Sequence, residues 1–389
     1  MHKSKNKSTF ALKAKGDAMM EERKMILKMI EEGKVTAEEG LKLLEAIGEE
    51  PTLQEQQASS KEKGTEQTSL STFVDWDNSE QRRSSYREPA GSSFLTGFLE
   101  SAIQKIREFD LDFNFGSYIE IDHIFQHRQL TEKHINISVE NGSVKIKPWD
   151  EEDVRVECVA KVYRAHNHDE ARHMFLSAVK FESDGEHLSF VTNAKSVKLE
   201  ATFYVPKTTF ESFKLYSFNG HFKSEQLHAD AIDLKVVNGS IYLDGTTCKR
   251  IGTETVNGPI ELLQIHAGDC SAKTVNGAIR IAGKDADSDV ETVNGTIHYD
   301  LEQIDEACFA DLKAATGSVY VKIPKNLRVD GKLKTNVGGF SCDLTGFEVV
   351  ENKKEFIQKT LRFTANQQGT YRMKLEAETN AGSIELKQD

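Results

Sequence analysis

Asparagine-glycine pairs recur along the second half of the sequence at a nearly fixed interval. Five successive pairs are separated by 19, 19, 19 and 18 residues, and their asparagines are Asn219, Asn238, Asn257, Asn276 and Asn294. A column of carboxamide groups could offer repeated donors and acceptors to a ligand. The same spacing also suits a structural column, in which the side chains bond to one another at stacked corners. We expect the structural role, because the repeat requires this spacing in any case.

Each of these pairs predicts a tight corner, because Asn-Gly adopts positive φ at low cost. An earlier pair in VENGSVKIKP opens the series, and weaker copies follow at Gly317, Gly338 and Gly382. The predicted structural corners are Asn141, Gly142, Asn219, Gly220, Asn238, Gly239, Asn257, Gly258, Asn276, Gly277, Asn294 and Gly295.

Three histidines, His166, His168 and His173, lie close together in the sequence and could bind a metal ion. Asp169 and Glu170 between them favour a polar turn that begins a helix over 167–181. The sequence contains no phosphate-binding loop, nucleophile elbow or zinc-protease motif. We therefore expect no catalytic residues, no metal and no cofactor.

The five cysteines do not form a recognisable metal or disulfide pattern. Their number is odd, no C-x-x-C pair occurs, and neighbouring cysteines are at least 22 residues apart. This pattern predicts buried free thiols in a reducing compartment. The residues are Cys158, Cys248, Cys270, Cys308 and Cys342.

The residues around the corners indicate which elements position them. After each corner apolar and polar residues alternate, as in Ile279, Arg280 and Ile281, so one set points inward and the other outward. The valines before the corners are expected to supply the inward position of a second strand; they are Val237, Val256, Val275 and Val293. Copies in register predict a mainly β domain over 118–389, a β-solenoid of about 19-residue coils. A β-sandwich of 19-residue hairpins is the alternative.

The N-terminal part of the chain has a different pattern. Apolar residues recur at helical spacing from Met25 to Ile30, and Thr36 with Glu39 forms a capping box. These features predict a helical hairpin over 18–48, which is too short to bury its own core and must self-associate or dock. Residues 49–91 are polar and aperiodic, and they predict a disordered linker.

Residues 92–116 give the strongest amphipathic pattern of the chain. This predicted helix could cap the end of the β domain, or it could lie on a membrane surface. Its polar side carries mixed charges, including Glu100, Lys105 and Arg107, which favours packing against protein. Its apolar face comprises Phe94, Leu95, Phe98, Leu99, Ile103, Ile106 and Phe109.

Composition excludes several classes of protein. The 389-residue chain has 50 basic and 62 acidic residues, and the resulting net charge of −12 argues against nucleic-acid binding. No run of about 18 apolar residues could span a membrane. The basic N-terminus lacks the apolar segment of a signal peptide, which predicts a cytoplasmic protein with possible membrane association.

Two segments resemble a known bacterial family. MMEERKMILKMIEEGKVTAEEGLKLLEAIG is similar to the short helical N-terminal module of the YvlB/LiaX-like family of Firmicutes. The VNG-x-I units and the ending AGSIELKQD resemble the candidate-adhesin β-strand-repeat domain that follows that module. The resemblance implies a link to the cell-envelope stress response, and it leaves exposure at the cell surface open.

Together these observations predict a non-enzymatic scaffold or sensor in envelope-stress signalling. Its protein partners would bind the solenoid surface and the helical hairpin, which could also mediate self-association. A peripheral membrane protein that uses helix 94–109 is the first alternative. A carbohydrate-active β-helix enzyme is a weaker one, because short uniform coils leave little material for a cleft.

Overall fold

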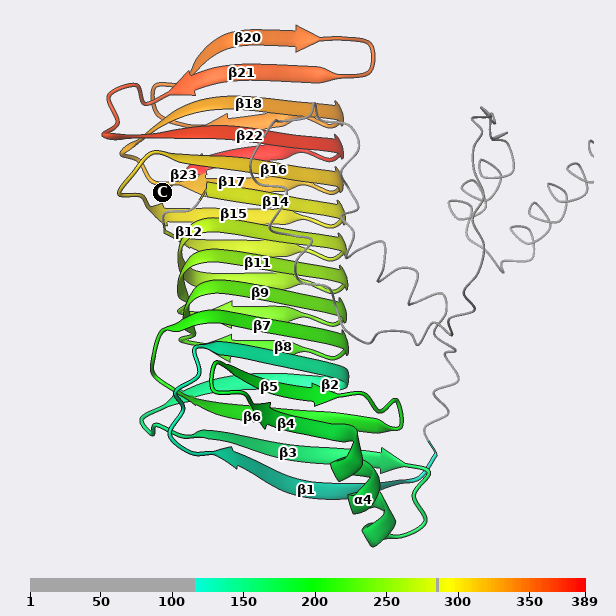
Figure 1. The fold of residues 1–389 in the computed structure, drawn as a ribbon. Coiled ribbons are helices and arrows are strands. Elements are labelled where there is room, and N and C mark those ends of the chain that lie inside the picture. Colours follow the sequence, from blue (N-terminus) through cyan, green and yellow to red (C-terminus); the bar gives the residue numbers. More distant parts are fainter. Residues whose placement is uncertain (1–115, 285–286) are drawn as a thin grey trace, which may run out of the picture. The chain divides into compact units, whose positions relative to one another are not determined.

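The computed structural model describes residues 116–284 and 287–389, which form a stack of β-strands (Figure 1). The first strand begins at Tyr118 and the last ends at Gln388, and the prediction of a mainly β fold is confirmed. The predicted hairpin (18–48), linker (49–91) and nearly all of the predicted helix (92–116) lie outside the described residues.

Each central coil contributes one strand to each of two faces, and the faces meet at the Asn-Gly corner. The first face contains β7 (Phe210–Asn219), β9 (His228–Asn238), β11 (Thr247–Asn257) and β14 (Asp287–Asn294). The second contains β8 (Phe222–Glu225), β10 (Ile241–Asp244), β13 (Ile279–Lys284) and β15 (Ile297–Gln303). The long strand β12 (Ile260–Asn276) runs from the second face of one coil into the first face of the next.

Successive coils are parallel and in register. Asn238 pairs with Asn219 on one side and with Asn257 on the other, and the same register continues through Asn276 to Asn294. Hairpin strands would pair antiparallel, so the sandwich alternative is wrong for this region. The central coils form the solenoid-like repeat that the 19-residue period predicts.

The core lies between the two faces. After the corner Ile279 is fully buried, whereas its neighbour Arg280 is exposed, as the alternation predicts. Before the corner the prediction is wrong. In β9 the core residues are Ile232, Leu234 and Val236, so Val237 points to the opposite side of the strand. Because Val236 and Val237 are both apolar, the sequence is compatible with either one pointing into the core. The structure places Val236 there, one residue earlier than expected.

At the N-terminal end, antiparallel strands close the stack. The corner of β2 packs below that of β7, with Asn141 opposite Asn219, and β5 and β6 form a further parallel coil below β2. Antiparallel pairing then adds β4 to β5, β3 to β6 and β1 to β3. The strands are β1 (Tyr118–His127), β2 (His134–Trp149), β3 (Val154–Tyr163), β4 (Val179–Ser183), β5 (His187–Thr192) and β6 (Val197–Pro206).

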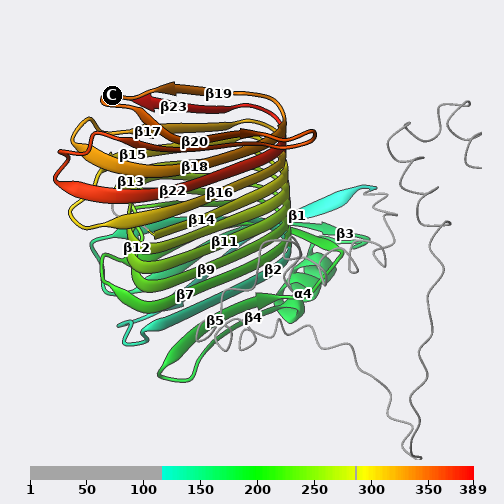
Figure 2. The same cartoon turned by 90° about the horizontal axis from the view of Figure 1, so that it is seen from above.

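One helix, α4 (His168–Ala178), covers this end and contacts β1, β3 and β4 (Figure 2). It was expected over 167–181. The helix ends earlier because Val179 already adopts an extended conformation and begins β4. The side chain of Phe175 is fully buried and lies against Phe125 of β1, with 6.3 Å between the ring centroids.

At the other end, the coil order in space differs from the order in the sequence. Strand β22 lies between β16 and β18 (Figure 1). Strand β23 lies between β17 and β19. The antiparallel hairpin β20–β21 then pairs with β18. The strands are β16 (Cys308–Thr316), β17 (Val319–Ile323), β18 (Leu327–Val337), β19 (Phe340–Asp343), β20 (Glu348–Lys354), β21 (Lys359–Ala365), β22 (Tyr371–Ala381) and β23 (Ile384–Gln388).

Candidate functional site

The corner asparagines form a hydrogen-bonded ladder along one edge of the stack. Asn238 Nδ2 donates to Asn219 Oδ1 over 2.9 Å, and Asn257 Nδ2 donates to Asn238 Oδ1 over 2.8 Å. Asn276 and Asn294 continue the ladder with bonds of 2.8 Å each. Each inner amide therefore donates to one neighbour and accepts from the other. This geometry supports the structural role over a ligand-binding one.

The ladder has a different arrangement at its two ends. Asn141 lies in register below Asn219, and its buried Nδ2 atom has no hydrogen-bond partner among the described residues. Towards the C-terminal end, Asn336 Nδ2 donates to Asn380 Oδ1 over 3.3 Å, one residue before the corner position. The continuous amide ladder is thus confined to the central coils.

Glycine is required at the corners because neighbouring coils approach closely there. A Cβ atom on Gly239 would lie 1.8 Å from the carbonyl oxygen of Gly220, and one on Gly277 would lie 2.0 Å from that of Gly258. The sequence prediction rested on backbone conformation alone. Contact between stacked backbones adds a second requirement, which a single unit of the repeat does not reveal.

Buried threonines form hydrogen bonds that link each coil to the Asn-Gly corner of the preceding coil. Thr255 Oγ1 donates to the carbonyl oxygen of Gly239 over 3.2 Å, and Thr274 makes the same bond to Gly258 over 3.1 Å. Sequence reasoning missed these residues, although the recurring T-V-N-G pattern was a signal for them. Each bond satisfies a buried hydroxyl that would otherwise be costly.

A second ladder, made of alternating charges, runs along the outer side of the first face. Lys235 Nζ lies 4.0 Å from Glu254, Lys273 lies 3.7 Å from Glu291, and Lys334 lies 3.1 Å from Glu378. Strand pairing places these residues opposite one another along the stack. In spatial order the ladder is Lys235, Glu254, Lys273, Glu291, Lys313, Glu378 and Lys334.

The charge ladder is partly buried, and this changes the protonation equilibria of its members. Burial raises the pKa of the Glu291 carboxyl, although Lys273 opposes the shift. Burial alone would lower the pKa of Lys273, but the carboxylates of Asp289 and Glu291 outweigh it and the pKa is raised. The neighbouring carboxylates therefore favour the charged form of this lysine.

The outer side of the second face carries aromatic side chains paired with basic ones. The Lys223 ammonium lies 4.8 Å from the centroid of the Tyr242 ring. Further along, His298 stacks on Tyr320 with 4.9 Å between centroids and an interplanar angle of 11°. Tyr320 is 39 % exposed, so this row offers aromatic surface to solvent. Cation–π and stacked pairs of this kind also occur at protein interfaces.

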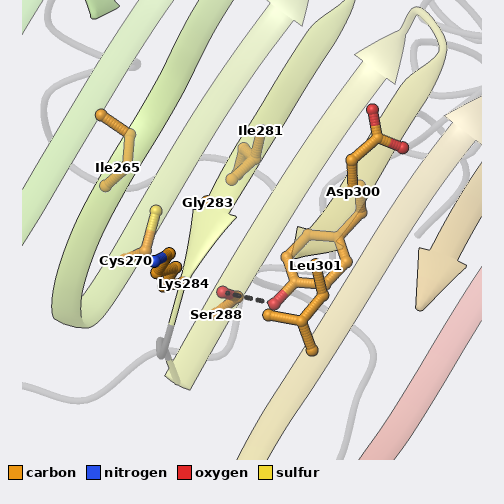
Figure 3. Close-up of a pocket in the computed structure, with 9 residues that line it drawn as sticks. Ile265, Cys270, Ile281, Gly283, Lys284, Ser288, Asp300 and Leu301 are labelled. Atoms are coloured by element: carbon orange, nitrogen blue, oxygen red, sulfur yellow. Dashed lines mark hydrogen bonds between the residues drawn. The ribbon is translucent and has the colours of Figure 1, made fainter. Parts of the chain in front are cut away.

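A small cavity in the described residues lies among β12, β13, β14 and β15. It holds about 10 Å³, room for at most one water molecule, and Ile265, Cys270, Ile281 and Tyr299 are among the residues that line it (Figure 3). The hydroxyl groups of Ser288 and Tyr299 lie 3.3 Å apart beside it. A cavity of this size accommodates no substrate.

The other candidate chemical groups have structural environments. Asn167 caps α4 by accepting a hydrogen bond from the Glu170 backbone, and His166 Nδ1 lies 2.9 Å from the Glu170 carboxylate, as expected for a polar turn that begins a helix. Among residues 116–284 and 287–389, no group of three metal-ligating side chains lies close enough to hold an ion.

The five cysteines are free thiols, but the predicted burial holds only for Cys158 and Cys270, since the other three are partly exposed. Burial raises the pKa of Cys158, Cys248 and Cys270 to about 12 in each case. Thiols with such pKa values carry almost no thiolate at neutral pH, so these three groups are poor nucleophiles.

The predicted partner or membrane face of helix 94–109 lies outside the described residues, as does the hairpin 18–48. Within the described part of the chain, no helix is long and apolar enough to cross a membrane.

Comparisons with known proteins place the chain in a family. It is 40 % identical over 373 residues to the uncharacterized protein YvlB of Bacillus subtilis (strain 168), covering 95 % of this chain and 99 % of that protein. Residues 21–52 match a SHOCT-like domain.

Solved structures of candidate adhesins show weaker similarity. One from Parabacteroides distasonis matches 69 % of this chain and 97 % of its own, with 14 % identity and a TM-score of 0.39. One from Bacteroides fragilis covers the same shares with 12 % identity and a TM-score of 0.32. The family model Toastrack DUF4097 matches residues 132–387, and the chain belongs to this family.

Proposed function

We propose that this protein is a non-enzymatic scaffold or sensor of the cell-envelope stress response. Its protein partners would bind the outer faces of the stack and the N-terminal hairpin over 18–48. The observation that carries the proposal is the pair of long, regular faces in which side-chain groups repeat at every coil. A surface of this kind suits recognition of an extended partner better than catalysis on a small substrate.

The second face is the best candidate for partner contact. Its outward row mixes aromatic and charged groups, and Arg280, His298 and Tyr320 are its exposed members. In spatial order the row is Lys223, Tyr242, Glu261, Arg280, His298 and Tyr320. Tyrosine supplies large contact area at low entropic cost, and it is enriched at protein interfaces.

Affinity purification from cells under membrane stress tests this proposal. The full chain should recover an envelope or regulatory protein, and the Tyr242→Asp/Tyr320→Asp variant should lose it. Ile124→Asp is the matched control, because Ile124 is also exposed but lies on β1 at the far end of the stack. Recovery that the tyrosine variant leaves unchanged would reject this face. Recovery of no such protein by the full chain would reject the function.

A second candidate function is contact with a membrane surface, and the β20–β21 hairpin favours it. Its turn is closed by a bond of 2.9 Å from the Glu355 amide to the Gln358 carbonyl, which leaves Phe356 and Ile357 at the tip. The Phe356 side chain is fully exposed and Ile357 is 71 % exposed. Turns ordinarily carry Gly, Asn or Asp at such positions, so two bulky apolar residues there need an explanation.

Three lysines, Lys353, Lys354 and Lys359, lie close to this tip, together with Glu355, which directly precedes Phe356. Apolar side chains beside lysines suit the headgroup region of an anionic bilayer. Co-sedimentation with anionic vesicles tests the idea, and Phe356→Asp/Ile357→Asp should reduce binding severely. Val337→Asp, at an exposed corner, is the control. A full chain that stays in the supernatant excludes this function.

A further inference from the structure

An apolar strip runs along the outer side of the first face, next to the asparagine ladder. It consists of the residues immediately before five successive corner asparagines. At about 4.8 Å per coil, the strip is about 19 Å long. Strand pairing aligns its members, which are Phe218, Val237, Val256, Val275 and Val293.

The strip has defined ends. In the coil below Phe218 the same position is occupied by Glu140, and in the coils above Val293 it is occupied by Ala315 and then Asn380. The apolar character is therefore limited to the coils that also carry the continuous amide ladder. A strip of fixed length suits an occupant of fixed length.

Three of the five side chains are shielded from solvent although they point away from the core, whereas Val275 and Val293 are partly exposed. Phe218 is 1 % exposed, Val237 is 0 % exposed and Val256 is 3 % exposed, yet none of them belongs to the hydrophobic core cluster. The adjacent charge ladder is shielded in part, with side-chain exposures of 11 % for Lys235, 10 % for Glu291 and 19 % for Lys273. Side chains on the outside of a flat sheet reach such values only beneath a cover.

We propose that the segment 94–109 of the same chain is this cover. As a helix it would be about 24 Å long, about one turn longer than the strip and therefore long enough to cover it. Its apolar face carries Phe94, Phe98, Ile103, Ile106 and Phe109, side chains that would fill the spaces between the strip's coils. The helix axis would run along the stack, across the strands, and its mixed charges would lie beside the alternating charge ladder.

The chain enters the described structure at the right place for this arrangement. Ile121 of β1 pairs with Ala160, Ala160 pairs with Leu199, and Leu199 pairs with Gly142 of the β2 corner. Tyr118, at the start of β1, therefore lies at the edge of the stack where the corners and the strip are found. Four strand spacings, about 19 Å, separate β1 from β7 and the first residue of the strip. Residues 110–117 span up to about 27 Å when extended, which is sufficient.

Docking would also control the membrane affinity of this helix. The same face of Phe98 and its neighbours cannot contact both the strip and lipid. A docked helix is therefore unavailable to a bilayer until it leaves the stack. The proposal does not depend on the scaffold function, because it concerns only contacts within one chain.

Limited trypsin digestion of the full chain tests the docking. Cleavage after Lys105 and Arg107 should be at least about tenfold slower than cleavage after Lys61 and Lys63 in the predicted linker. The reason is that trypsin cleaves only the fraction of molecules in which the segment is undocked. Val256→Asp should abolish this protection while the melting temperature of the β domain stays near that of the wild type. Val350→Asp is the matched control, because Val350 is an exposed valine of β20.

The helix side is tested by Phe98→Asp, which should also abolish protection, whereas Glu100→Lys on the polar side should not. Equal cleavage rates in the wild type, or unchanged protection in Val256→Asp, would overturn the proposal. Protection that is lost on dilution would assign the strip to a second copy of the chain. Protection that requires vesicles would assign the helix to lipid, and either result also overturns it.

Discussion

Thr379 donates a hydrogen bond of 2.8 Å to the carbonyl oxygen of Gly317, a residue 62 positions earlier in the chain. On the other side of the same coil, Thr335 donates to the carbonyl oxygen of Gly382 over 3.0 Å. These are the bonds that join consecutive coils elsewhere in the stack. The coil of β22 and β23 is therefore an insert, with earlier parts of the chain on both sides.

Removal of residues 371–389 should destabilise coils that the deletion does not touch. Strands β16 and β18 would both lose their parallel partner. We expect hydrogen exchange in β16–β19 to approach the unprotected rate, while β9 and β11 keep their protection. As a control, replacing Phe356 and Ile357 by Asn-Gly should leave exchange in β16–β19 unchanged. Wild-type protection in the truncated chain would show that the insert is dispensable.

Gly239→Ala should be strongly destabilising, by about 3 kcal/mol or more, because its Cβ would collide with a backbone atom that cannot move independently. The clash is with the carbonyl oxygen of Gly220 at 1.8 Å. Gly339→Ala is the matched control: a Cβ there meets no atom within 4 Å, and the expected cost is below about 0.5 kcal/mol. Urea unfolding measures both, and similar midpoints would contradict the close approach of the coils.

Ile279→Asp and Arg280→Asp should have very different effects, although the residues are adjacent. Ile279 is fully buried, so an aspartate there would place an uncompensated charge in the core at a cost of several kcal/mol. Arg280 has a 57 % exposed side chain, lies 3.9 Å from Asp300, and should cost about 1 kcal/mol or less. Thermal unfolding distinguishes them, and equal losses would mean that the faces of β13 are misassigned.

The stability contributed by Glu291 should depend on pH. Its folded pKa is raised by burial, so the protonated carboxyl favours folding and the benefit disappears as the pH rises through the folded pKa. The free energy of unfolding of the wild type, relative to Glu291→Gln, should therefore fall between pH 4 and pH 7.

Glu351 provides a comparison of opposite sign. Hydrogen bonding to Lys353 lowers its pKa, so its contribution should be lost as the pH falls. Denaturant titration of the wild type, Glu291→Gln and Glu351→Gln at pH 4 and at pH 7 gives the contribution of each carboxyl to the free energy of unfolding. The two contributions should change in opposite directions with pH. A parallel pH dependence for both variants would contradict the burial of Glu291.

The sequence predicts the repeat well because its signals are local. The period, the corner positions and the inward residues such as Ile279 all follow from patterns within a single unit. The orientation of Val237 could not be derived in this way, because Val236 and Val237 are both apolar and only the register of the whole strand separates them.

Contacts made over long distances in the sequence were beyond the reach of these patterns. The alternation of the charge ladder is complete only because Glu378 lies between Lys313 and Lys334. Read in chain order, the two lysines are consecutive members of the series, and the pattern is lost. The apolar strip is a different case, because its valines recur visibly in the sequence and only their outward orientation was missed.

The antiparallel strands at both ends of the stack have a consequence for how copies of this protein behave together. A parallel coil with a free edge would accept the coil of another molecule and could grow into a filament. Here the first face ends in β4 on one side and in the β21–β20 hairpin on the other, and β4 and β21 run against the direction of the coils that they border. The strands β4 and β21 therefore interrupt the parallel register of the first face, and Lys353 and Lys354 on β20 add charge to its outer edge. The repeat has a fixed number of coils because its ends do not match each other.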